Sequence, residues 1–185
     1  MKKIQILALW ALSSLLFSGC GSTRSAAVQE EKVKDTRPEW IEYGKKDTIL
    51  PYSTGKGKLT NDEASLNLAR SQARIALLQP GELFTKGVIQ TFIDQKEDEN
   101  EKLRLLKILD NSAILREVIF NASEIEEQYR DTDRTIYVLL TTPKDKLVKE
   151  LVKVAKLFNP QPSDNSTEEK MSQAYDRYVA ENSFK

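Results

Sequence analysis

The sequence predicts an α+β domain that follows an N-terminal export signal. Three observations carry the fold prediction. A short extended segment with two glycines, residues 52–58, precedes a long stretch of helical apolar spacing. From residue 114 the apolar residues alternate as in a strand, and a regular amphipathic stripe follows at residues 147–158. Strands and helices that gather in separate stretches are typical of α+β folds.

The first twenty residues have the layout of a bacterial secretion signal. Two lysines precede a fourteen-residue apolar run, residues 4–17, and two small residues precede Cys20, which is the only cysteine. A basic end, an apolar stretch and small residues at the cut are what a signal peptide needs. The cysteine behind them resembles a lipoprotein lipobox. This resemblance implies a signal at residues 1–19, lipid attached to Cys20 and a membrane partner for the lipid chains.

Two other fates of this segment stay open. The first is a retained transmembrane helix, which the length of the segment disfavours: fourteen helical residues span about 21 Å, less than the roughly 30 Å of hydrocarbon that a membrane span must cross. Plain secretion with cleavage after Ala26 or Ala27 is the second alternative, because Phe17 stands where a lipobox usually has Leu, Val or Ile. Gly21, in place of a retaining aspartate, favours the outer membrane, with the domain in the periplasm or at the cell surface.

Composition narrows the possible chemistry. The chain has 28 basic and 28 acidic residues; removing the two signal lysines leaves 26 − 28 = −2, with no broad basic footprint for nucleic acid. The chain contains no histidine, which excludes Ser–His and Cys–His nucleophiles and removes a main zinc ligand. A single cysteine excludes internal disulfides. We therefore expect no enzymatic activity, no cofactor, no metal and no nucleic-acid partner.

The mature chain divides into three parts by composition. Residues 20–36 are small, polar and charged and indicate a tether, whose flexible residues would span roughly 22 Å. Residues 37–160 form the predicted α+β domain. Residues 161–185 indicate a polar linker and a short amphipathic helix carrying Met171 and Tyr175. This helix is predicted to fold back onto the domain, with partner binding and disorder as alternatives.

The first half of the domain is predicted to be strand followed by helices. Thr60 and Glu63 form a capping-box pattern that starts a helix with an alanine-rich face. Pro80 and Gly81 are predicted to end it. Two further helices are indicated by apolar spacing, one over residues 83–93 and, beyond a charged loop, one carrying Leu103, Leu106 and Leu109.

The second half is predicted to be a hairpin followed by a helix. Residues 114–129 and 135–141 form its antiparallel strands, and residues 130–133 are a turn signal. Thr142 is predicted to cap the next helix, with Pro143 in its first turn. That helix carries an apolar stripe until Asn159 and Pro160 end it.

Four features follow one another behind the lipobox: Pro38 and Trp40, Gly55 and Gly57, the helix at 64–76 and the strand at 135–139. Their order resembles the Lpp-twenty lipoprotein family over residues 38–158. The resemblance implies three strands in one antiparallel sheet, helices on one of its faces in the order β-α-α-(α)-β-β-α, and no enzymatic activity. It also implies that flagellum-associated lipoproteins and penicillin-binding-protein activators are possible relatives in role.

Several weaker motifs are interpreted structurally. The Gly55–Lys58 segment lacks the spacing of a phosphate loop, so its glycines indicate close packing of a strand. Asp131 and Asp133 indicate a turn rather than a calcium loop. Trp40 is predicted to cover the core rather than a partner. Three glutamates, interpreted as protecting a solvated sheet edge rather than as a paired-carboxylate site, are Glu124, Glu126 and Glu127.

Together these patterns favour a non-enzymatic outer-membrane lipoprotein that serves envelope structure or assembly through protein contacts. One alternative is a regulator that activates a peptidoglycan synthase, which the short tether disfavours. A flagellum-associated lipoprotein is another, and a lipid- or small-ligand-binding module would need an apolar cavity. The oligomeric state is left open.

Overall fold

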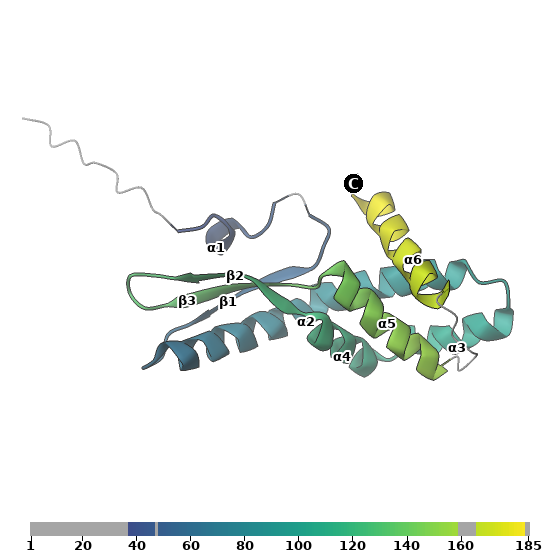
Figure 1. The fold of residues 1–185 in the computed structure, drawn as a ribbon, viewed down its shortest axis with the longest axis horizontal. Coiled ribbons are helices and arrows are strands. Elements are labelled where there is room, and N and C mark those ends of the chain that lie inside the picture. Colours follow the sequence, from purple (N-terminus) through teal and green to yellow (C-terminus); the bar gives the residue numbers. More distant parts are fainter. Residues whose placement is uncertain (1–36, 47, 159–165, 184–185) are drawn as a thin grey trace, which may run out of the picture. The chain divides into compact units, whose positions relative to one another are not determined.

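The computed structural model describes residues 37–46, 48–158 and 166–183. Figure 1 shows an α+β fold in which helices separate the first strand of a three-stranded sheet, along the chain, from its other two strands. The predicted fold class and element order are confirmed. The elements are α1 (Trp40–Tyr43), β1 (Tyr52–Gly57), α2 (Asp62–Asp94), α3 (Glu99–Leu109), α4 (Ser112–Ala122), β2 (Glu124–Arg130), β3 (Ile136–Thr141), α5 (Lys144–Phe158) and α6 (Ser166–Asn182).

The sheet has the order β1-β3-β2, and both pairings are antiparallel. The apolar strand β3 therefore lies in the centre, between β1 and the charged strand β2. A bulge between Ile125 and Glu127 interrupts the β2–β3 register. The predicted turn at residues 130–133 lies between these strands, and Arg134, directly after it, has a φ of 70°. The hairpin is confirmed, although its first strand begins ten residues later than residue 114.

The first half of α2 packs on one face of the sheet at very short range. A Cβ atom at Gly55 would lie 2.0 Å from the carbonyl oxygen of Ala69, and one at Gly57 would lie 2.0 Å from that of Ser65. Only glycine lets the two backbones approach so closely. This confirms the close packing predicted for the glycine segment. The buried residues of this "sheet core" are Ala69, Ala73, Leu77, Ile119, Ile136, Val138 and Leu140.

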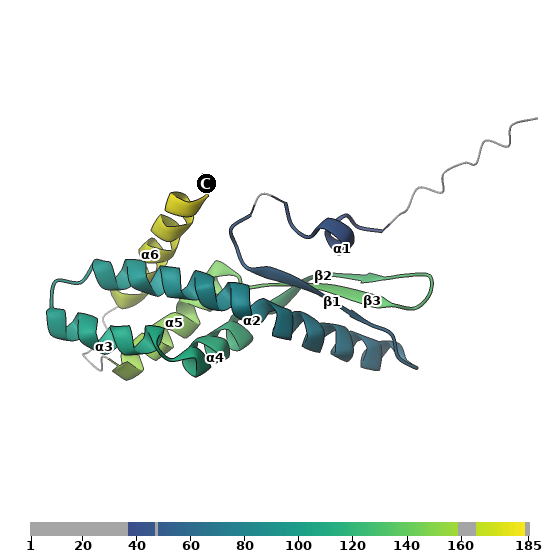
Figure 2. The same cartoon turned by 180° about the vertical axis from the view of Figure 1, so that it is seen from behind.

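The short helix α1 lies on the opposite side of the sheet from α2 (Figures 1 and 2). Trp40 lies in this helix, and only 8% of its surface is exposed. The indole Nε1 donates a hydrogen bond of 2.7 Å to Glu127 of β2. Trp40 therefore covers the sheet, as predicted, and its polar atom has a partner.

Pro80 does not end a helix, so this prediction is wrong. α2 is one helix of 33 residues that continues through Pro80 and Gly81. Pro80 and Ala76, the residue four positions earlier, are both exposed, so water can reach the carbonyl that proline leaves unbonded. Gly81 is buried against the side chain of Ile119. Packing on both sides of Pro80 therefore outweighs its local preference.

Residues 114–122, predicted to be strand, belong to helix α4. Leu115, Val118, Ile119 and Ala122 are buried at helical spacing, and the alternation seen in the sequence is accidental. The Asn111 side chain caps this helix by accepting a hydrogen bond from the Ile114 amide at 3.2 Å. The order of elements still matches the prediction. Two predicted helices are joined in α2, which removes one helix, and α4 adds one where a strand was predicted.

Two predicted caps are also wrong. The N-cap of α2 is Asn61, not Thr60, since its Oδ1 accepts from the Ala64 amide at 2.7 Å. At α5, the hydroxyl of Thr142 is buried without a hydrogen-bond partner in the described part of the chain, and the first helical bond reaches the carbonyl of Pro143.

The third predicted helix is present as α3, but it is turned relative to its predicted face. Leu105 and Ile108 are buried, whereas Leu103 and Leu106 are exposed.

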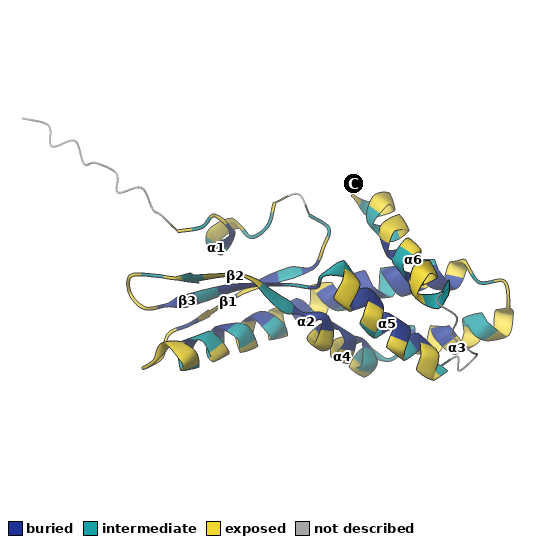
Figure 3. Cartoon of the chain, in the orientation of Figure 1, coloured by how far each residue is buried: buried dark blue, intermediate teal, exposed yellow. Residues whose placement is uncertain are grey.

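The remaining helices enclose a second core with the latter half of α2, as the burial colours in Figure 3 show. Tyr175 and Tyr178 of α6 meet the ring of Phe84 edge-on at centroid distances of 5.5 and 5.3 Å. The predicted folding back of the C-terminal helix is thus confirmed. The largest residues of this "helical core" include Phe84, Ile89, Phe92, Leu105, Leu115, Leu147, Leu151 and Met171.

Candidate functional site: a groove between two helices

The predicted lipid attachment residue, Cys20, and the apolar run at residues 4–17 lie outside the described residues. Both therefore stay predictions. Within residues 37–46, 48–158 and 166–183, no helix is long and apolar enough to cross a membrane. In the same ranges, no cluster of three or more potential metal-ligating side chains is found.

The three glutamates of β2 lie on an edge strand, which agrees with the prediction that they protect a sheet edge. Each has a different partner: Glu124 pairs with Lys146, Glu126 with Lys45, and Glu127 accepts from Trp40. The carboxylates therefore bind neighbouring elements separately and do not form a paired site.

The predicted turn aspartates serve the hairpin. Asp131 accepts from the Thr132 amide, and Asp133 accepts from the Thr135 amide at 2.9 Å. The Lys58 ammonium, at 2.8 Å, and then the Thr135 amide hold the pKa of Asp133 well below its usual range. This ion pair joins β1 to the hairpin turn.

A groove on the outer side of α2, beside α4, is the most distinctive surface among the described residues. It consists of two adjoining hollows of about 460 Å³ each, which share Ile75 and Leu78. Large apolar side chains are unusually open here: Ile75 is 69% exposed, Leu83 64% and Phe120 50%. Hydrophobic side chains that gather on one surface mark an interaction site more often than isolated ones do.

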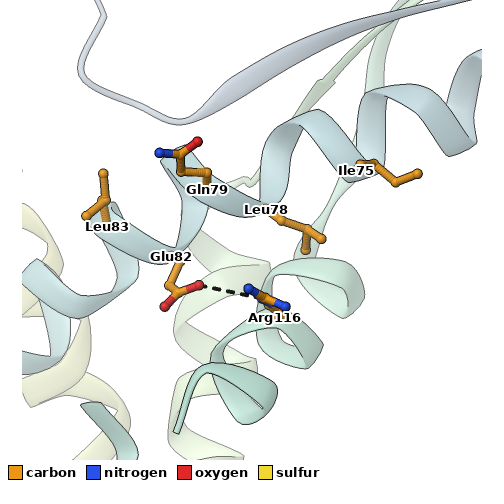
Figure 4. Close-up of a pocket in the computed structure, with 6 residues that line it drawn as sticks. All are labelled: Ile75, Leu78, Gln79, Glu82, Leu83 and Arg116. Carbon is orange, nitrogen blue, oxygen red and sulfur yellow. Dashed lines mark ion pairs between the residues drawn. The ribbon is translucent and has the colours of Figure 1, made fainter. Parts of the chain in front are cut away.

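Helical geometry explains how these side chains come together. Ile75, Leu78 and Glu82 repeat at three- and four-residue spacing, which aligns them on one side of α2. Figure 4 shows Leu78 and Glu82 directed towards α4, from which Arg116 points back at them. The opposite side of α2 is occupied by the two cores. The groove residues are thus the part of the helix surface that neither core covers.

Glu82 is the acidic centre of the groove. Its carboxylate lies 3.0 Å from Lys86 and 3.6 Å from Arg116, and it accepts a hydrogen bond of 2.8 Å from Ser112. The bond from Lys86, followed by that from Ser112, lowers the pKa of Glu82. Its negative charge is therefore retained, and it is shared between two cations.

The other end of the groove is basic. The Arg74 guanidinium lies 4.2 Å from the centroid of the Phe120 ring, and its Nε atom is buried without a hydrogen-bond partner in the described ranges. Arg70 makes no ion pair within those ranges. The hollows are lined by three arginines, at positions 70, 74 and 116, and by one acid, so their net charge is 3 − 1 = +2.

Sequence reasoning did not identify this groove. Leu83 belongs to a predicted apolar helical face and Phe120 to a predicted strand, and no prediction concerns Ile75. One signal was available: Arg70, Arg74 and Ile75 lie on the side of the helix away from Ala69 and Ala73. Without the position of α4, this pattern could not be distinguished from an ordinary solvated helix face.

The comparisons with known proteins do not assign the chain. No protein-family model matches it, and no curated protein matches it significantly. The resemblance to the Lpp-twenty family therefore remains a prediction.

Proposed function

We propose that this protein is a non-enzymatic lipoprotein of the bacterial outer membrane, anchored through Cys20, whose α+β domain serves envelope structure or assembly through protein contacts. The observation that carries the protein-contact part is the groove beside α2. Its exposed Ile75, Leu83 and Phe120 are edged by arginines, which resembles the composition of interface centres more than that of a catalytic cleft.

The anchoring part is supported by the first twenty residues. A lone thiol after an apolar run and two small residues is the chemistry that lipid attachment needs. Several fatty chains, at about 0.8 kcal/mol per buried methylene, would hold the domain far more firmly than a single myristoyl group. The domain would face the periplasm or the cell surface.

Metabolic labelling with a palmitate analogue tests the anchor. The wild-type chain is expected to incorporate the label and to sediment with outer membranes, whereas Cys20→Ala should do neither. Gly21→Ala, next to the acceptor, is the matched control and should label normally. Equal labelling of the wild-type chain and Cys20→Ala would refute lipid attachment at this sulfur.

Crosslinking in intact cells separates the roles that remain as alternatives. A photoreactive residue in place of Ile75 should capture a structural envelope protein under the main proposal. Capture of a peptidoglycan synthase would favour the regulatory role, although a tether of roughly 22 Å gives that role little reach. Capture of flagellar components would favour the flagellum-associated role.

A further inference from the structure

We propose that the groove beside α2 binds an amphipathic helix of a partner protein, with aspartate and glutamate flanking the apolar face of that helix. The inference rests on the proposed function, in which the domain works through protein contacts, and it specifies the chemistry of the partner. The shape of the groove, its hydrogen-bonding capacity and its charge support this partner.

The length of the groove suits a helix. Its lining runs along α2 from Asn67 to Leu83, which at 1.5 Å per residue is about 24 Å. A helix of about sixteen residues has the same length. The apolar residues Ile75, Leu78 and Phe120 lie in the middle of this run, where they can contact residues spaced three and four apart on a partner helix.

The walls of the groove favour a helix over an extended peptide. Both walls are helices, α2 and α4, whose backbone groups, apart from the Ala76 carbonyl opposite Pro80, are bonded within the helices. An extended segment would bring unpaired amides and carbonyls against side chains that cannot satisfy them. A helix satisfies its own backbone and can pack side chains between those of the walls.

The charge of the groove selects an acidic helix. Its lining carries a net +2, and Arg70 and Arg74 lie at the end where no acid lines the hollow. Glu82 is already held by Lys86 and Arg116, so it does not neutralise these arginines. Carboxylates on the partner would pair with them, and such complementarity mainly raises the association rate and excludes basic competitors.

A second copy of this chain is a poorer occupant. Two grooves placed face to face would set +2 against +2. An anionic lipid surface would satisfy the arginines, but the hollowed shape between two helices offers less contact to a flat surface than to a rod. Binding of either occupant to the groove would overturn the proposal.

The test is a selection of helical peptides of about sixteen residues against the full chain in a non-ionic detergent. Enriched peptides are expected to carry apolar residues at positions i, i+3 or i+4 and i+7, with carboxylates beside them. By fluorescence anisotropy, Ile75→Glu should weaken their binding about tenfold. Arg70→Glu should weaken it about fivefold and reduce its dependence on salt.

Matched controls are available on α5. Leu157 is 78% exposed and Lys149 is exposed, and neither lines the groove. Leu157→Glu and Lys149→Glu should change binding less than about twofold. Circular dichroism should be the same for all four variants, since each altered side chain lies at the surface.

Several results would overturn the proposal. These are enrichment of basic or non-helical peptides, absence of any enriched peptide, and equal weakening by the α5 controls. Dimerisation that Ile75→Glu abolishes would assign the groove to a second copy. Co-sedimentation with phosphatidylglycerol vesicles that Arg70→Glu abolishes would assign it to lipid. Failure of the anchor is distinguishable, because Cys20→Ala changes labelling and leaves peptide binding unchanged.

Discussion

The two cores of this domain are stabilised in different ways. In the sheet core, Gly55 and Gly57 let β1 approach the backbone of α2 directly, with alanines in between. In the helical core, large side chains such as Phe84, Phe92 and Leu115 fill the space between helices. The sheet core should therefore be sensitive to added atoms, whereas the helical core should be sensitive to removed ones.

Truncation of Phe92 should have the largest effect. Phe92 is almost completely buried in the helical core, so Phe92→Ala should lower the free energy of unfolding by about 4 kcal/mol, through lost burial and a residual cavity. Ala73→Gly in the sheet core removes less volume and should cost about 1 kcal/mol. Urea unfolding followed by circular dichroism measures both. If both variants lost the same free energy of unfolding, the proposed difference between the two cores would be contradicted.

The reverse comparison adds one carbon to each core. Gly55→Ala places a Cβ atom against the backbone of α2, which cannot move without displacing the helix, and should cost about 3 kcal/mol. At Gly87 the three atoms nearest to an added Cβ all belong to the Tyr178 side chain, the closest at 2.2 Å, and this side chain can rotate away. The improved helix propensity of about 1 kcal/mol should offset that displacement. A larger loss for Gly87→Ala than for Gly55→Ala would reverse the interpretation.

Pro80 lies where α2 passes from one core to the other, and its replacement tests how the cores are joined. Pro80→Ala should stabilise the protein by about 1 kcal/mol, because the exposed Ala76 carbonyl regains a helical hydrogen bond. Gln79→Ala, at the adjacent exposed position, is the control and should change stability little. Thermal unfolding measures both, and destabilisation by Pro80→Ala would show that the helix needs the proline geometry.

On the second face of the sheet, Trp40 makes a polar contact with β2 whose contribution can be measured. Trp40→Phe keeps an aromatic ring over the sheet but leaves Glu127 without its indole donor, which should cost about 1 kcal/mol. Tyr43→Phe, in the same short helix and exposed, should have no measurable effect. If Glu127→Ala and Trp40→Phe prove fully additive in a double-mutant cycle, the hydrogen bond contributes nothing.

The smallest predicted effect concerns alkaline pH. Burial, and then the nearby Asp176 carboxylate, raise the pKa of Tyr175 to about 12. Between about pH 10, where the unfolded tyrosine ionises, and pH 12, the unfolded state binds fewer protons, so stability falls as pH rises. Tyr175→Phe should flatten this fall in urea unfolding at about pH 11. Tyr43→Phe should not, and an unchanged slope in Tyr175→Phe would contradict the prediction.

The elements predicted correctly are those whose patterns depend on near neighbours. The central strand β3 is rich in β-branched and large apolar residues, the hairpin turn has its aspartates, and α5 has an uninterrupted apolar stripe. Gly55 and Gly57 also indicated close packing, because glycine inside a strand has few other uses. The sequence did not indicate the candidate site, and the anchor that it predicts at Cys20 lies outside the described residues.

Only the tertiary structure decided the rest, because the competing terms are long-range. Local preference at Pro80 predicts a break, but packing of both halves of α2 outweighs it. The alternation at residues 114–122 suits a strand, but burial of Leu115 and Ile119 selects a helix. The groove exists because α4 lies beside α2 and leaves Ile75 uncovered. A local sequence pattern does not determine which neighbouring element will cover a side chain. That packing decides both how stable the fold is and which side chains remain exposed.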